Sequence, residues 1–319
     1  MPSSYSFHRI SGGLTGLAVG DALGVPVEFL PREILDTQPV TGMAGYGTHN
    51  QPPGTWSDDA ALAFCLAQSL CDTGTVDYRD IAARFVRWLR EGYWSARGQV
   101  FDVGITTATA IDRLARGVPP TLAGPDGEYT QGNGALMRIL PLAFYFHKHY
   151  PGDEKFLNII HNVSKLTHGH PVCQMASVVY IRTALHLLQG RSATEAYRQS
   201  IREIPRLYAR HPFETYLEKF RRILQGDLPE LPRTQIKSSG YVIHTLEAAL
   251  WSLLTTNDFK QAVLTAVNLG HDTDTTGSVT GGLAGILYGY DAIPAPWRQT
   301  LARHDEILDL AECLAVKKI

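Results

Sequence analysis

The segment from residue 60 to residue 67 reads Ala-Ala-Leu-Ala-Phe-Cys-Leu-Ala, so no position in it is polar. A helix formed by this segment has no face that suits water, and other helices must surround it. Apolar residues recur at helical spacing through most of the remaining chain, and no region keeps the two-residue alternation of a half-buried strand. The sequence therefore predicts an all-α fold, a compact multi-helix bundle with a buried central layer.

The same periodicity places the expected helices along the chain. They are expected over residues 8–22, 57–71, 77–91, 104–116, 134–149, 153–165, 171–189, 192–203, 213–225, 240–254, 257–268, 275–289 and 297–315. The segments between them are short, as in the proline-containing stretches 51–54, 117–120 and 228–232, and none is typical of a domain boundary. We expect a single domain over residues 1–319, with 44% hydrophobic residues to build its core.

Glycine recurs every fourth residue near the end of the chain, at positions 277, 281, 285 and 289. In a helix this spacing leaves one face without side chains, so a second helix can approach it closely. The pattern resembles a motif of membrane helix dimers. In this chain we interpret it as tight packing between two helices near a functional site.

Overall charge argues against several kinds of partner. The formal net charge is -2, and no basic tract with interleaved aromatic residues is present, so the footprint of a nucleic-acid-binding protein is absent. The N-terminus has no basic segment followed by an uninterrupted apolar core, since Asp21 interrupts the stretch 12–27. We find no run of about 18 apolar residues. We therefore expect a soluble cytoplasmic protein, a monomer without membrane partners.

The four cysteines carry no metal-binding or disulfide signature. They are Cys65, Cys71, Cys173 and Cys313, each in an apolar, helix-like context and without C-x-x-C spacing. We expect all four to be buried reduced thiols.

Two acidic clusters carry most of the chemical information. Residues 55–59 read Thr-Trp-Ser-Asp-Asp, and residues 270–277 read Gly-His-Asp-Thr-Asp-Thr-Thr-Gly. Each places carboxylates beside a hydroxyl at the start of an apolar helix. If the fold brings them together, they supply four carboxylates and two hydroxyls, an oxygen-only ligand set suited to Mg²⁺ or Mn²⁺.

A simpler interpretation is helix capping, because serine and aspartate at a helix N-terminus are favoured without any metal. A cap needs only one side chain, however, and further carboxylates repel one another. The second cluster also resembles the start of a calcium loop. Position twelve of that loop would be Leu283 in place of the bidentate glutamate, which argues against a calcium sensor.

Four other segments combine glycine or proline with polar residues. Residues 20–28 set Asp21 and Glu28 on either side of a turn, and residues 131–138 form a glycine-rich turn whose free N–H groups could hold a phosphate. In the latter, Asn133 could equally be a helix N-cap. Segments 101–107 and 165–171 have the same ambiguity between binding and capping.

Taken in order, these segments resemble the ADP-ribosylglycohydrolase family, which includes ADP-ribosylarginine hydrolases and the dinitrogenase reductase-activating glycohydrolase. The resemblance covers nearly the whole chain. It rests on G-D-A-L-G-x-P-x-E at 20–28, W-S-D-D at 56–59, D-x-G-x-T at 102–106, G-N-G-x-x-M-R at 132–138, L-T-H at 166–168, S-G-Y at 239–241 and D-T-D-T-T-G at 272–277.

The resemblance implies an orthogonal bundle of helices with two Mg²⁺ or Mn²⁺ ions in a cleft. The metal ligands it implies are Ser57, Asp58, Asp59, Asp272, Asp274 and Thr275. The candidate catalytic residues are Asp58, Asp59, Asp102, Asp274 and Glu28, of which Glu28 resembles an acid on a mobile loop that gates or supports the site. Substrate contacts are expected from Gly132, Asn133 and Gly134 to the diphosphate and ribose, and from His168, Tyr241 and His271 along the cleft.

Two positions depart from the common family pattern. Many members have threonine where Ser57 stands, a change that keeps the hydroxyl ligand. Many have glycine where His271 stands, and an imidazole there could narrow the cleft or contact the substrate. The acceptor preference can therefore differ from that of other members.

The expected activity is hydrolysis of the bond between ADP-ribose and an acceptor on a protein or small molecule. An acid-rich cleft favours a cationic leaving group, which points to arginine. Serine-linked or other O-linked ADP-ribose is the alternative acceptor. Two other classes are a catalytically silent ADP-ribose-binding relative and a phosphohydrolase, which the intact acid set and the absence of a Lys/Arg clamp respectively disfavour.

Overall fold

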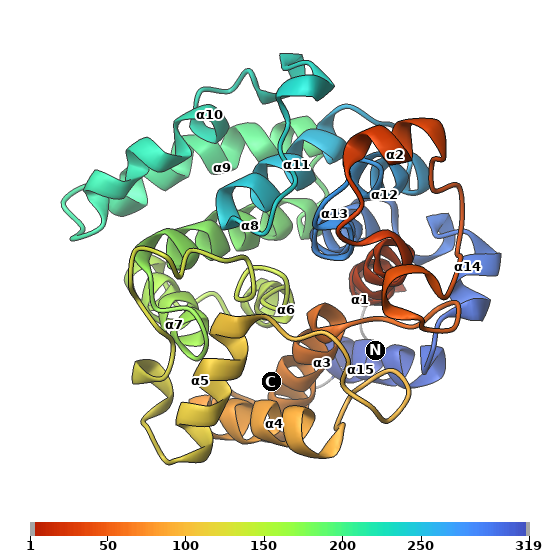
Figure 1. Ribbon diagram of the computed structural model, residues 1–319. Coiled ribbons are helices and arrows are strands. Elements are labelled where there is room, and N and C mark those ends of the chain that lie inside the picture. The colour runs from red at the N-terminus through yellow and green to blue at the C-terminus, as the bar shows by residue number, and fades with distance from the viewer. Residues whose placement is uncertain (1–3, 317–319) are drawn as a thin grey trace.

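The computed structural model describes residues 4–316, whose helices cross one another at varied angles (Figure 1). The α-helices are α1 Ser4–Gly24, α2 Arg32–Thr37, α3 Asp58–Thr73, α4 Tyr78–Glu91, α5 Ile105–Ala115, α6 Pro141–Lys148, α7 Asp153–Lys165, α8 Pro171–Leu188, α9 Ala193–Tyr208, α10 Arg221–Leu224, α11 Val242–Leu254, α12 Phe259–Val267, α13 Thr273–Tyr288, α14 Ala295–Thr300 and α15 His304–Val316. No strand occurs between residues 4 and 316, only two isolated bridges. The all-α prediction is confirmed.

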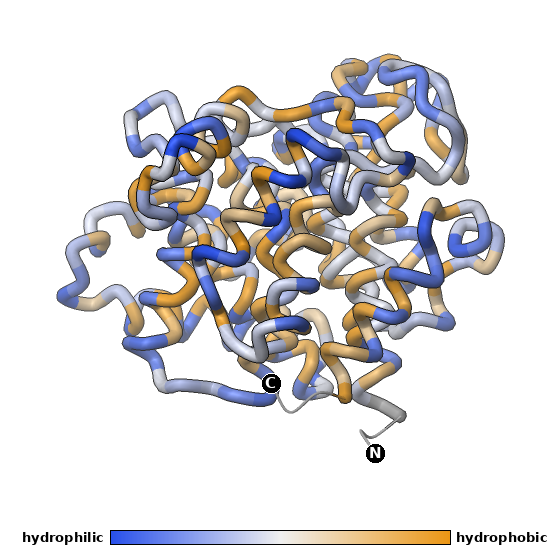
Figure 2. Tube along the Cα trace, turned by 90° about the horizontal axis from the view of Figure 1, so that it is seen from below, coloured by the Kyte–Doolittle hydropathy of each residue, from blue (hydrophilic) through white to orange (hydrophobic). Residues whose placement is uncertain are grey.

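The apolar segment 60–67 lies in helix α3, and every residue of the segment is buried. Helices α1, α4, α6, α13 and α15 surround it, as an all-round apolar helix requires. Figure 2 shows that hydrophobic residues are concentrated inside the molecule and hydrophilic residues on the outer loops.

Helices α1 and α13 pack antiparallel at the centre of the fold (Figure 1). A Cβ added at Gly16 would lie 2.3 Å from the carbonyl oxygen of Gly281, and one added at Gly20 would lie 2.0 Å from that of Gly277. Only glycine permits this backbone approach. The predicted close packing of the glycine face is therefore present, with a second row of glycines on α1 as its partner.

Three expected helices differ from the structure. Residues 134–140 form turns, and α6 begins only at Pro141, where proline fits the first helical position. The stretch 297–315 splits into α14 and α15, because the Ala302 N–H donates to the Gly54 carbonyl (2.9 Å) instead of continuing a helix. Most of 213–225 is the 3₁₀ helix Glu214–Phe220.

The prediction of a reduced thiol is wrong for two of the four cysteines. Cys71 and Cys313 form a disulfide, which joins the last turn of α3 to α15 across a Cα–Cα distance of 6.0 Å. Cys65 and Cys173 are buried and free, as expected. The pair is 242 residues apart in sequence, so no spacing signal could have revealed it.

One helical stretch, Ser6–Val27, is long and apolar enough to cross a membrane, with a mean hydropathy of 1.3. The expectation that no stretch reached this length was wrong by that measure. Within the fold 94% of it is buried, and a core helix passes the same test.

The domain prediction can be checked by limited proteolysis. The buried hydrophobic residues, from Ile10 on α1 to Ala315 on α15, form one cluster. We expect cleavage in the exposed loops to leave the chain associated, with one cooperative unfolding transition. Two halves that separate and stay folded would contradict a single domain.

Candidate active site

The first acidic cluster lies at the N-terminus of α3 and is held there by another helix. Ser57 is the N-cap, and Asp58 and Asp59 are the first two helical residues. The carboxylate of Asp21, on α1, accepts hydrogen bonds from the N–H groups of Ser57 (2.9 Å) and Ala60 (3.0 Å). Because Asp21 supplies the capping bonds, the carboxylates of Asp58 and Asp59 are left free to face the cleft.

The second cluster opens α13 and meets the first. The Thr275 hydroxyl donates to Asp59 Oδ1 (3.3 Å) across the gap between the two helix starts. Asp274 Oδ1 accepts from the Thr275 N–H (2.8 Å), and the Asp272 N–H is held by the Ser238 carbonyl (2.9 Å). The fold thus brings together two sequence clusters that lie more than 200 residues apart.

Glu28 and Asp102 lie beside these helix starts. Glu28 follows the 3₁₀ helix Val25–Val27, is 5% exposed, and contacts the imidazole of His49. Ligand atoms of Glu28, Asp272 and Asp274 lie within 4.8 Å of one another, and so do those of Glu28, His49 and Asp102. Both groups could hold a cation.

Asn133 connects the glycine-rich turn to the second cluster. Its side-chain amide donates to Asp272 Oδ2 (2.8 Å) and to the Thr245 hydroxyl (2.9 Å), and its N–H donates to the Gly240 carbonyl (3.1 Å). No helix starts at Asn133, so the alternative of an N-cap is wrong. Asn133 orients a carboxylate of the acidic site.

A cavity of about 440 Å³ opens over these side chains. Its polar lining includes Glu28, Asp58, Asp59, Asp102, Asn133, His168, Asp272 and Thr275, together with the backbone of Gly132 and Gly134. A neighbouring cavity of about 580 Å³ shares Gly132 and Gly240 and is lined by Tyr241. Ser57 and Asp274 lie behind the cavity wall, buried to 4% and 1% exposure.

His271 lies outside this cavity. Its side chain is exposed and borders a separate hollow of about 330 Å³ that includes Arg32 and Lys237. Its backbone has φ of +62°, and it pairs with the loop after Glu28, accepting from the Phe29 N–H (2.6 Å) and donating to the Leu30 carbonyl (2.7 Å). A positive φ is the conformation that glycine adopts most easily, which gives a physical reason for the glycine of many resembling sequences.

Burial raises the pKa of every carboxyl group in the cluster. The pKa of Glu28 rises to about 9, first through burial and then through the charges of Asp102 and Asp272. For Asp58, Asp59 and Asp274 burial likewise raises the pKa well above the usual range, and neighbouring carboxylates add to the effect. The cluster is therefore poorly stabilised as bare negative charge, and a bound cation would relieve it.

The donor set fits a divalent cation. Asp59 Oδ2 and Asp272 Oδ1 are buried and have no hydrogen-bond partner among residues 4–316. Buried polar atoms normally have partners, and a cation would supply one to both. Carboxylate and hydroxyl oxygens are the ligands that Mg²⁺ and Mn²⁺ prefer.

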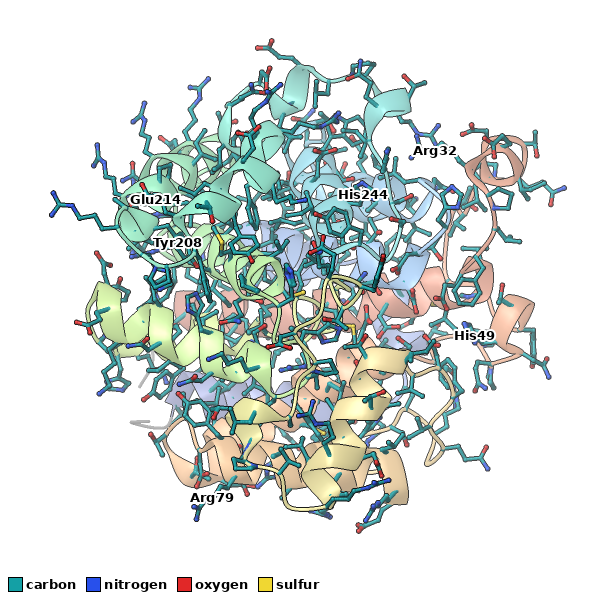
Figure 3. The ribbon with its side chains drawn as sticks, turned by 60° about the vertical axis from the view of Figure 1, so that its left-hand side comes forward. Arg32, His49, Arg79, Tyr208, Glu214 and His244 are labelled. Atoms are coloured by element: carbon teal, nitrogen blue, oxygen red, sulfur yellow. A yellow bond between two sulfur atoms is a disulfide. The ribbon has the colours of Figure 1, made fainter. Side chains whose placement is uncertain are left out.

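Two residues at the site were not among the predicted set. Asp21 was noted only as an acid beside a turn, although it is fully buried and holds the start of α3, and burial raises its pKa to about 7. His49 projects from the loop after α2, at the edge of the ribbon in Figure 3, and contacts Glu28. A lone histidine in a loop carries no sequence signal, whereas the G-D-A spacing around Asp21 could have revealed it.

The all-α fold that carries this site is also found in a known protein. A solved ADP-ribosylglycohydrolase-related protein complex has the same fold, with a TM-score of 0.79 and 34% identity over 98% of this chain and 99% of that one. The arrangement defines a glycoside-cleaving hydrolase.

This chain belongs to the ADP-ribosylglycohydrolase family, whose pattern matches residues 2–318. It is 36% identical to an ADP-ribosylarginine hydrolase, Tri1, of Serratia proteamaculans over 98% of this chain and 81% of that protein. It is 33% identical to the ADP-ribosyl-[dinitrogen reductase] glycohydrolase of Rhodospirillum rubrum over 92% of this chain and 90% of that protein. It is 26% identical to human ADP-ribosylhydrolase ARH3 over 97% of this chain and 93% of that protein. The chain is a glycohydrolase.

Proposed function

We propose that this enzyme removes ADP-ribose from arginine on modified proteins and that it needs two divalent cations, Mg²⁺ or Mn²⁺. The observation that carries the proposal is the density of buried carboxylates around the cavity. Relatives named ADP-ribosylarginine hydrolases, at 36% and 35% identity, support the choice of arginine. We further propose that the protein acts as a cytoplasmic monomer.

The cation ligands in this proposal are Ser57, Asp58, Asp59, Asp272, Asp274 and Thr275. The oxygens Asp59 Oδ2 and Asp272 Oδ1 support it, because both are buried and have no hydrogen-bond partner among residues 4–316. Cations bound there would act as Lewis acids and provide a nucleophile near neutral pH.

The chain's own residues would orient the substrate and handle charge and protons. Gly132 and Gly134 would hold the diphosphate and the distal ribose through backbone N–H groups, and Asn133, whose own N–H is bonded to the Gly240 carbonyl, would hold the turn in place. Carboxylates around the reacting carbon would stabilise the positive charge that develops on the ribose as the acceptor leaves, as they do in glycosidases. Binding energy from the diphosphate would position the bond to be cleaved.

Glu28 and Asp102 are acids that line this cavity beside the proposed cation ligands. The pKa of Asp102 is raised by burial, although the nearby His49 imidazole opposes the shift. Asp102 is only half-buried, and it can exchange protons with solvent and substrate. When these acids are ionised they attract a guanidinium leaving group, whereas a neutral serine oxygen gains nothing from their charge.

The acceptor is tested with one peptide carrying ADP-ribose on arginine and a matched peptide carrying it on serine. We expect kcat/KM to be at least about tenfold higher for the arginine-linked substrate, which corresponds to about 1.4 kcal/mol in transition-state binding. ADP-ribose release in the presence of Mg²⁺ or Mn²⁺ is the measurement. Faster release from serine would overturn the choice of acceptor.

The Asp102→Ala variant tests the proton-transfer role. We expect its kcat on the arginine-linked substrate to fall about 100-fold, the lower range for general acid–base catalysis. Asp112→Ala is the matched control, because Asp112 lies on the exposed face of α5 and pairs only with Arg116 (2.8 Å). An unchanged kcat in Asp102→Ala would leave Asp102 a structural residue.

A further inference from the structure

Arg138, in the turn that follows Gly134, is completely buried and has no acidic partner among residues 4–316. Its Nη2 donates to the Val163 carbonyl (3.1 Å) and to the Thr167 hydroxyl (2.7 Å). Its Nε and Nη1 have no hydrogen-bond partner, and its guanidinium lies 4.7 Å from the centroid of the Phe85 ring. An unpaired buried cation is unfavourable for folding, so its retention needs another explanation.

The Thr167 hydroxyl links Arg138 to His168. Its oxygen lies 2.7 Å from Arg138 Nη2 and 3.0 Å from His168 Nδ1. A guanidinium can only donate hydrogen bonds, so Thr167 Oγ1 must accept from it. The hydroxyl oxygen has a second lone pair, but among residues 4–316 the hydroxyl proton has no acceptor within hydrogen-bond distance other than Nδ1, so we assign the proton to that bond. An Nδ1 that accepts this proton carries none itself, and the proton of the neutral ring must be on Nε2.

The Nε2 side of His168 faces the acidic cavity. His168 is part of the cavity wall, and a Cβ added at Gly132 or Gly134 would lie 3.4 or 3.2 Å from Nε2. Among residues 4–316 no protein group bonds to Nε2. Burial and the charge of Arg138 lower the pKa of His168 to about 3, so the ring is neutral at neutral pH. Nε2 is thus a free donor directly under the glycine-rich turn.

We propose that Arg138 and Thr167 are positioning residues that fix His168 as its Nε2–H tautomer and aim that proton at an oxygen of the bound ADP-ribose. The identity of the acceptor oxygen rests on the proposed function, whereas the tautomer does not. In this proposal the charge of Arg138 has a role, because a guanidinium can only donate and so occupies one lone pair of Thr167 Oγ1. It also places a positive charge behind the turn proposed to hold the diphosphate.

The tautomer is measured directly with ¹⁵N-labelled protein by long-range ¹H–¹⁵N correlation of the His168 ring, in the absence of substrate. We expect a protonated Nε2 and a bare Nδ1 in the native protein. In Thr167→Val, which keeps the side-chain shape and removes the hydroxyl, we expect a mixture of tautomers. Thr167→Ser should restore the native pattern. Arg138→Met, checked for its fold by circular dichroism, should also give the mixture.

Binding and kinetics test the direction of the donor. The Kd of ADP-ribose, measured by calorimetry, should rise about tenfold in Thr167→Val, the effect of weakening one hydrogen bond to a charged group. KM should rise more than kcat falls, and Thr167→Ser should recover both values. Thr183→Val is the matched control, because Thr183 is an equally buried helical threonine that bonds to the Val179 carbonyl (3.0 Å) away from the cleft.

A native protein with the proton on Nδ1, or a Thr167→Val variant with native tautomer and native Kd, would overturn the inference. Failure of the proposed function gives a different result. The native protein would then show the Nε2–H tautomer and neither bind ADP-ribose nor release it from a modified peptide.

Discussion

Asp58→Ala and Asp274→Ala variants are expected to lose activity by roughly a thousand-fold or more, as when a main electrostatic group of an active site is removed. Asp58 opens α3 and lines the cavity, while Asp274 in α13 lies behind it within ligand distance of Glu28 and Asp272. The proposed cations would lose a ligand in either variant. Release of ADP-ribose from the arginine-linked substrate measures the effect, and chelation of the native enzyme should reproduce it.

The fold should survive both substitutions. Burial and neighbouring carboxylates raise the pKa of both groups, so neither stabilises the metal-free protein as a free anion. Asp77→Ala is the matched control, since Asp77 caps α4 by accepting from the Arg79 N–H (2.9 Å) outside the cleft. We expect it to lose about 1 kcal/mol of stability and no activity. Full activity of the chelated enzyme would refute metal dependence.

Gly281→Ala is expected to be strongly destabilising. Its Cβ would lie 2.1 Å from the Gly16 carbonyl oxygen, and neither α1 nor α13 can move aside within the core. Overpacking of this kind costs about 3 kcal/mol or more. Activity should fall as well as stability, because separation of the two helices moves Asp21 on α1 away from Asp274 on α13.

Thermal unfolding of Gly281→Ala checks the expectation, with kcat/KM measured well below the transition. Gly127→Ala is the control, since a Cβ there meets no atom within 4 Å. A melting temperature within a degree or two of the native value would show that the α1–α13 contact tolerates a wider spacing.

The sequence predicted the helices that carry the acids well, for local reasons. Ser57 and Asp272 precede long apolar stretches, so capping and periodicity both indicate a helix start at that point. The glycine spacing on α13 likewise predicted a close contact with another helix. It did not identify the partner, because the matching glycines on α1 lie among ordinary apolar residues.

Features that depend on contacts distant in sequence could not be predicted. The break between α14 and α15 is made by Gly54, and the disulfide joins Cys71 to Cys313 across the fold. His49 contacts Glu28 although the two residues lie 21 positions apart in sequence. A disulfide is also unusual in a reducing compartment, and the cytoplasmic location stays a prediction.

The glycine contact between α1 and α13 sets a dimension of the proposed cation site. Asp21 fixes the start of α3 from one helix, and Asp274 is carried by the other, so the interaxial spacing determines how far apart the two ligand clusters lie. Mg²⁺ requires oxygen distances of about 2.0–2.1 Å, whereas Ca²⁺ takes about 2.3–2.6 Å. If the proposed cations bind there, the choice between ions would depend partly on residues without side chains, and a family member adapted to a larger ion should show its changes at these glycines.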